Sequence, residues 1–93
     1  EAAFRQVLIL AMVGISIAFY LPLEPWNKSL LILTHLIGVI VELINSAIEA
    51  AVDHSSLEPH PLAKRAKDLG SAAQLISLTA LALIWALALT GLF

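Results

Sequence analysis

Two long stretches without a charged residue, Gln6–Leu23 and Leu69–Phe93, constrain the fold most strongly. A helix needs about 20 mostly apolar residues to cross the hydrocarbon core of a membrane, which is about 30 Å thick. The composition points the same way, because 60% of the residues are hydrophobic and only 13% are charged. An average soluble domain carries about twice that share of charged residues. The two stretches therefore predict two transmembrane helices.

A third stretch, Ser29–Val52, is long enough to span a membrane but contains Glu42 and Glu49. A carboxylate surrounded by hydrocarbon is costly, so such residues face the interior of a helical bundle or a water-filled cavity. This stretch is therefore predicted to be a transmembrane helix whose polar residues face protein or water. Together the three stretches predict an all-α membrane protein in which residues 1–93 form a single domain of three transmembrane helices per subunit.

The basic residues are distributed unevenly around these stretches, and this asymmetry predicts the orientation in the membrane. One side carries Arg5, Lys64, Arg65 and Lys67, whereas the other carries only Lys28. Short loops rich in lysine and arginine stay on the cytoplasmic side. The N-terminus and the second loop are therefore predicted to be cytoplasmic.

The absence of cysteine excludes disulfide bonds and removes the usual thiolate ligands of metal sites. No segment alternates basic and aromatic residues, so no nucleic-acid partner is expected. The sequence opens at Glu1 with neither an initiating methionine nor the pattern of a signal peptide. We therefore expect that an N-terminal segment of the protein precedes it.

The segment "VELINSAIEAAVD", residues 41–53, places polar residues at helical spacing inside the third stretch. At about 100° per residue, Glu42, Asn45, Glu49 and Asp53 fall within an arc of about 80°. His35 lies on the same face, seven residues before Glu42. Together these residues form a polar stripe. Given the predicted orientation, the stripe leads from the middle of the membrane to the cytoplasm, where a lipid headgroup meets water-soluble molecules.

Other polar residues are predicted to lie at the cytoplasmic end of the stripe. They are Lys67, Asp68 and Ser71, from the start of the last helix, and Glu1, from the start of the first. Several carboxylates close to a lysine, without cysteine, favour oxygen-liking cations such as Mg²⁺ over zinc. This chemistry favours a metal-bound nucleotide as the reagent. The sequence has neither a GxxxxGK[ST] loop nor the glycine-rich loop of protein kinases.

Simpler interpretations of the stripe remain open. Glu42 and Asn45 are also the kind of residue that joins helices by hydrogen bonds inside a bundle, and His35 is more typical of an ordinary bundle residue than of a site residue. Packing explains Glu49 less well, because that residue lies near the membrane surface. At the level of function, an ion-conducting bundle and a purely structural membrane subunit are the alternatives to an enzyme.

Three blocks in fixed order carry a family resemblance: "EAAFRQ" at 1–6, "VELINSAIEAAVD" at 41–53 and "AKDLGSAA" at 66–73. The chain resembles the small integral-membrane diacylglycerol kinases of Gram-negative bacteria along its whole length. The resemblance implies a homotrimer with three transmembrane helices per subunit and active sites shared between neighbouring subunits. It also implies transfer of the γ-phosphate of ATP to diacylglycerol, which yields phosphatidic acid at the cytoplasmic face of the inner membrane. An undecaprenol kinase of the same family is the alternative.

The resemblance also implies roles for individual residues. Glu49 would be the catalytic carboxylate, and Glu1 and Glu49 would hold Mg²⁺ on the nucleotide. The implied nucleotide-binding residues are Glu1, Glu49, Asn45, Glu58, His60, Lys67 and Asp68. The implied lipid-binding residues are Glu42, Asn45, Ala2 and Arg5. The sequence departs from the family in two places: Val7 replaces an acidic residue, and the amphipathic surface helix that precedes the first block in the family is absent from this sequence.

Overall fold

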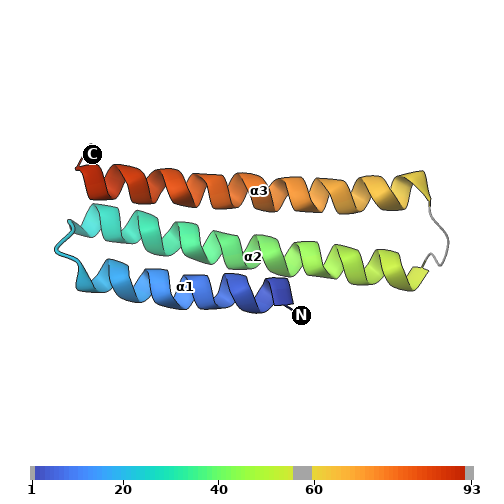
Figure 1. Cartoon of the computed structure of the whole chain (residues 1–93), viewed down its shortest axis with the longest axis horizontal. Coiled ribbons are helices and arrows are strands. Elements are labelled where there is room, and N and C mark those ends of the chain that lie inside the picture. Colours follow the sequence, from blue (N-terminus) through green and yellow to red (C-terminus); the bar gives the residue numbers. More distant parts are fainter. Residues whose placement is uncertain (1, 56–59, 92–93) are drawn as a thin grey trace.

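The computed structural model describes residues 2–55 and 60–91, and three α-helices make up nearly all of this part of the chain. They are α1 (Ala2–Tyr20), α2 (Pro25–Ser55) and α3 (Pro61–Thr90) (Figure 1). Each is long and apolar enough to cross a membrane, and the described residues contain no strand. The prediction of an all-α membrane protein with three spanning helices is therefore confirmed.

The helix ends follow from proline, histidine and glycine. Pro25 opens α2 and Pro61 opens α3, positions where a missing N–H costs no hydrogen bond. His60 caps α3, because its Nδ1 accepts a hydrogen bond from the N–H of Leu62 at 3.1 Å. Gly91 ends α3 in the left-handed conformation, with φ of 71°, which glycine adopts without strain. The two prolines therefore begin α2 and α3 before the apolar stretches that predicted them, whereas Gly91 ends α3 within its stretch.

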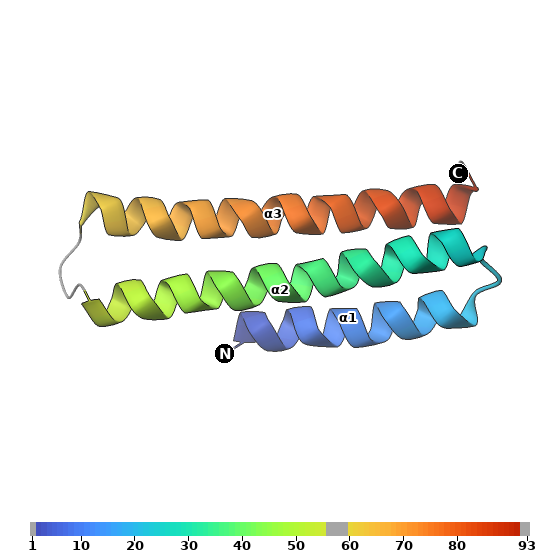
Figure 2. The same ribbon diagram turned by 180° about the vertical axis from the view of Figure 1, so that it is seen from behind.

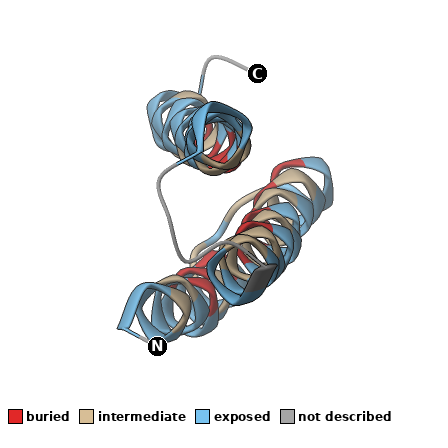
Figure 3. Cartoon of the chain, turned by 90° about the vertical axis from the view of Figure 1, so that its right-hand side faces the viewer, coloured by how far each residue is buried: buried red, intermediate tan, exposed pale blue. Residues whose placement is uncertain are grey.

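Seen end-on, the three helices form an open angle with α2 at its corner (Figure 3). Helix α2 packs against both α1 and α3, but among residues 2–55 and 60–91 no Cα atom of α1 lies within 8 Å of one in α3. The buried residues lie on the sides where the helices face one another (Figure 3). Large apolar side chains such as Ile9, Leu75 and Ile76 point outward, as expected of surfaces in contact with lipid or with another helix.

Helix α1 is much shorter than its neighbours. It contains 19 residues and α2 contains 31, so at 1.5 Å per residue α2 is longer by about 18 Å. The N-terminal end of α1 lies beside the middle of α2, and the ends of α2 and α3 next to residues 56–59 project beyond it (Figures 1 and 2). Within the described chain, the end of α2 that carries Glu49 and Asp53 therefore has only α3 beside it.

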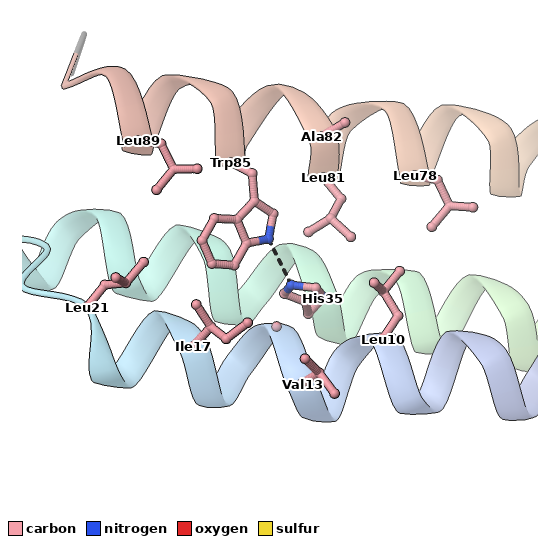
Figure 4. Close-up of a pocket in the computed structure, with 11 residues that line it drawn as sticks. Leu10, Val13, Ile17, Leu21, His35, Leu78, Leu81, Ala82, Trp85 and Leu89 are labelled. Atoms are coloured by element: carbon pink, nitrogen blue, oxygen red, sulfur yellow. Dashed lines mark hydrogen bonds between the residues drawn. The ribbon is translucent and has the colours of Figure 1, made fainter.

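A buried histidine connects all three helices. The imidazole of His35 lies against Gly14 of α1, where even a Cβ atom would overlap it. Its Nε2 accepts a hydrogen bond at 3.0 Å from Nε1 of Trp85 on α3 (Figure 4). The three residues line an apolar groove of about 620 Å³ between α1 and α3. His35 therefore serves as a packing residue of the bundle, which agrees with the simpler interpretation of its place on the stripe.

Replacing Trp85 by Phe tests this contact. The phenyl ring keeps most of the packing but donates no hydrogen bond, so Nε2 of His35, a residue only 2% exposed, loses its partner. An unpaired buried acceptor costs about 1–3 kcal/mol, and we expect the free energy of unfolding in detergent micelles to fall by this amount. Trp26→Phe is the matched control, because Trp26 is 61% exposed. Equal losses for the two variants would contradict the assignment.

Candidate functional site

The polar stripe runs along one face of α2 from a buried region to an exposed one. Glu42 is 3% exposed and Asn45 is 8% exposed, whereas Glu49 is half-buried and Asp53 is exposed. All four belong to one uninterrupted helix, so they lie on one face, as their spacing predicts. The stripe therefore offers a path from the buried middle of α2 to its open end.

Glu42 forms hydrogen bonds to two donors. Its Oε1 accepts from Nε2 of Gln74 at 3.0 Å, and its Oε2 accepts from Oγ of Ser46 at 3.3 Å. Gln74 belongs to α3, so the first of these bonds crosses from one helix to the next. The interpretation of Glu42 as a residue that joins helices is therefore compatible with the structure, and it does not exclude a second role toward a ligand.

Asn45 orients the carboxylate of Glu49. Its Nδ2 donates to Oε1 of Glu49 at 3.2 Å. Its Oδ1 lies so close to Gly70 of α3 that a Cβ atom there would overlap it, and in the described part of the chain this oxygen has no hydrogen-bond partner. Gly70 therefore leaves the space in which the Asn45 amide points its N–H toward Glu49.

An ion pair joins the two helices at the open end of the stripe. Nζ of Lys67 on α3 lies 2.6 Å from Oδ1 of Asp53, which places Lys67 at the level of the stripe as the sequence predicted. Asp68 instead pairs with Lys64 along α3 at 2.8 Å, with both side chains largely exposed. The structure thus brings Lys67 to the stripe, whereas the contact of Asp68 is with its own helix.

The remaining residues with implied roles are either exposed or outside the described part of the chain. Ala2 and Arg5 are exposed on the first two turns of α1, and His60 is exposed at the start of α3. Glu1 and Glu58 fall outside the described residues, so the structure does not place them. The metal and nucleotide roles implied for these residues stay predictions.

The oxygen-rich stripe fits a magnesium ion better than a transition metal. Within residues 2–55 and 60–91 no group of three His, Asp or Glu side chains could hold a metal. Mg²⁺ does not require such a cage, because it keeps several waters and binds one or two carboxylates together with substrate phosphates. Glu49 supplies a half-buried carboxylate of this kind, with one oxygen engaged by Asn45.

Sequence reasoning missed Gln74, whose amide donates a hydrogen bond to Glu42 from the neighbouring helix. The signal was available, because Lys67, Gly70, Gln74 and Ser77 recur at helical spacing and mark a face of the last helix. Gly70, Gln74 and Ser77 are all buried against α2. Sequence spacing alone could not show that this face meets the polar stripe.

Gly70→Ala tests the contact that orients Glu49. The added methyl group either strains the α2–α3 contact or turns the Asn45 amide away from Glu49, and overpacking of this kind costs about 1–3 kcal/mol. We expect Gly70→Ala to lower the free energy of unfolding in micelles. In a protein that already carries Asn45→Ala, we expect the same substitution to lower it much less. Gly38→Ala is the control, because its Cβ would meet Ser77 Oγ at an ordinary 3.7 Å. A Gly70→Ala protein as stable as Gly38→Ala would contradict this contact.

Comparison with known proteins identifies the family. Residues 1–89 match the family model of prokaryotic diacylglycerol kinase. A diacylglycerol kinase of Pseudomonas aeruginosa is 53% identical over 91 residues, which cover 98% of this chain and 74% of the relative. A diacylglycerol kinase of Helicobacter pylori strain 26695 is 53% identical over 93 residues, which cover all of this chain and 73% of the relative. The one from Escherichia coli K12 is 42% identical over the whole chain and 76% of its own length. This chain belongs to the prokaryotic diacylglycerol kinase family.

Proposed function

We propose that the protein is an ATP-dependent diacylglycerol kinase, which transfers the γ-phosphate of ATP to the free hydroxyl of diacylglycerol and produces phosphatidic acid. The observation that carries the proposal is the polar stripe, which leads from buried Glu42 to exposed Asp53 on a helix long enough to span a membrane. A membrane lipid approaches such a stripe from its buried end, and a nucleotide approaches from its open end. The family to which the chain belongs supports this choice of substrates.

Glu49 is the proposed catalytic residue. Phosphoryl transfer depends mainly on positioning and on neutralising charge, with a carboxylate accepting the proton of the attacking hydroxyl. Glu49 is half-buried between the two ends of the stripe, and Asn45 holds one of its oxygens. Glu42 lies seven residues deeper, about 10 Å along the helix.

We assign Glu42 and Asn45, with Ala2 and Arg5 of α1, to the lipid.

Lys67 is the proposed contact to the nucleotide phosphates. Asp53 holds its ammonium group at the open end of the stripe, so the charge is already in place when a triphosphate arrives. On the resemblance to the family, Glu1, Glu58, His60 and Asp68 complete the nucleotide site. Asp68 would have to exchange Lys64 for a new partner, a small change because solvent screens an exposed ion pair and it contributes little to stability.

Glu49 and Glu1 are the residues that would hold Mg²⁺ on the phosphates. When bound there, the ion would neutralise part of the negative charge that develops on the transferred phosphoryl group. Lys67 would contribute a further positive charge, and Asn45 would keep Glu49 oriented. This arrangement would relieve the repulsion between Glu49, Asp53 and an incoming triphosphate.

A homotrimer in the bacterial inner membrane, with the open end of the stripe on the cytoplasmic side, completes the proposal. A single described chain is open, because α1 and α3 each contact α2 but do not contact each other. Polar groups within the membrane must be covered by protein, so neighbouring copies would close the stripe and contribute residues to shared sites. The distribution of basic residues, with Arg5, Lys64, Arg65 and Lys67 on one side, supports the cytoplasmic orientation.

Phosphate transfer from radiolabelled ATP, measured on the purified protein in mixed micelles, tests the proposal. With diacylglycerol present we expect labelled phosphatidic acid, and we expect EDTA to abolish the labelling because the site requires a divalent cation. Undecaprenol, offered in a parallel reaction, is expected to be a poor acceptor. Labelling of undecaprenol alone would replace the acceptor lipid in the proposal, and labelling of neither lipid would refute kinase activity.

A further inference from the structure

Gln74 has no place in the site as proposed above, although it is buried in the middle of the protein. It is 7% exposed on the face of α3 that meets α2. Its Nε2 donates two hydrogen bonds, one to the backbone oxygen of Gly38 at 3.1 Å and one to Oε1 of Glu42 at 3.0 Å. Its Oε1 has no hydrogen-bond partner within the described residues.

The two bonds fix the orientation of the Gln74 amide. A primary amide has only two N–H groups, and both are engaged by atoms of α2 that lie one helical turn apart. The bond to Gly38 anchors the amide to a rigid helix backbone, so the other N–H meets Glu42 at a defined position. An apolar side chain of similar length would pack two helices without leaving a buried carbonyl oxygen unpaired. The amide at this position is therefore explained by the Glu42 carboxylate that it contacts rather than by the shape of the helix contact.

We propose that Gln74 is a positioning residue for the lipid, which holds the Glu42 carboxylate in the orientation that receives the acceptor lipid. This inference rests on the proposed function, in which Glu42 contacts the lipid. Gln74 holds Oε1 of Glu42 at 3.0 Å, whereas the bond that Ser46 donates to Oε2 is longer, at 3.3 Å. Oε2 is therefore the atom that accepts a hydrogen bond from a hydroxyl of the lipid, and Gln74 keeps it facing the site.

A purely structural role for Gln74 predicts different kinetics. If the amide only joined α2 to α3, its loss would lower stability and would affect the use of both substrates. If Gln74 acts through Glu42, its loss raises KM for diacylglycerol and leaves KM for ATP unchanged, because the nucleotide meets the opposite end of the stripe. The effect also disappears once Glu42 itself has been altered, since residues that act as a unit are not additive.

The test is a double-mutant cycle on the purified protein with Gln74→Met and Glu42→Gln. We expect each single substitution to raise KM for diacylglycerol at least about fivefold, KM for ATP to stay within about twofold, and the double variant to match Glu42→Gln. Ser77→Ala is the matched control, because Ser77 is buried one turn further along the same face and has no bond to Glu42. Its KM for diacylglycerol should match that of the unaltered protein.

The outcomes separate this inference from the proposed function. If Glu42→Gln leaves KM for diacylglycerol unchanged, the assignment of Glu42 to the lipid is wrong, and the role of Gln74 is wrong with it. If Glu42→Gln raises that KM but Gln74→Met does not, or if the two effects add, only the role of Gln74 is wrong. Changes in KM for both substrates in Gln74→Met would likewise overturn it in favour of a structural contact.

A measurement on the unaltered protein covers the case in which Gln74→Met does not fold. The sequence contains two glutamines, Gln6 and Gln74, so selective ¹⁵N labelling of glutamine gives few side-chain amide signals in an NMR spectrum. We expect diacylglycerol to shift the Gln74 amide signal, whereas a non-hydrolysable ATP analogue alone leaves it in place. A Gln74 signal insensitive to diacylglycerol would overturn the inference.

Discussion

Hydrocarbon offers no hydrogen bonds, and this constraint governs how the chain handles its polar residues. Glu42 is almost completely buried, and its carboxylate accepts hydrogen bonds from Gln74 on the neighbouring helix and from Ser46 on the same helix. Gln74 in turn is tied to the backbone of Gly38. The α2–α3 contact is therefore fixed by polar partners as well as by shape. A site that must bring a hydroxyl, a phosphate and charged side chains together at the edge of a membrane depends on such a network, because water cannot supply the missing partners.

Glycine makes this network possible by letting polar side chains lie flat against the next helix. Gly70 leaves the space taken by the Asn45 amide, and Gly14 leaves the space taken by the imidazole of His35. Small residues at helix contacts are common in membrane bundles because they allow close approach. Here they do more, since each one determines where a polar group on α2 points. At Asn45 the consequence reaches the proposed catalytic residue, because this amide orients Glu49.

The sequence predicted the helices and the stripe, because both depend on local spacing along one chain. Apolar stretches of spanning length led to three helices, and a period of about 3.6 residues led to one face for Glu42, Asn45, Glu49 and Asp53. The partners on other helices were harder to predict, because they depend on how each helix is rotated and shifted against its neighbour. Gln74 was missed for this reason. The placement of Lys67 was predicted correctly, since the short connection between α2 and α3 fixes the level at which they meet.

The central claim is that the polar stripe is a catalytic centre whose proton acceptor is Glu49, and kcat of Glu49→Gln in the lipid kinase assay tests it most directly. The amide keeps the shape of the side chain but loses the base and a metal ligand, so we expect an intact, folded assembly with kcat reduced at least about a hundredfold. Lys64→Gln serves as the control, because its ion pair with Asp68 is exposed, and it should cost far less. Near-normal turnover by Glu49→Gln would contradict the claim, and loss of turnover in Asp53→Asn alone would place the chemistry one turn further along the stripe.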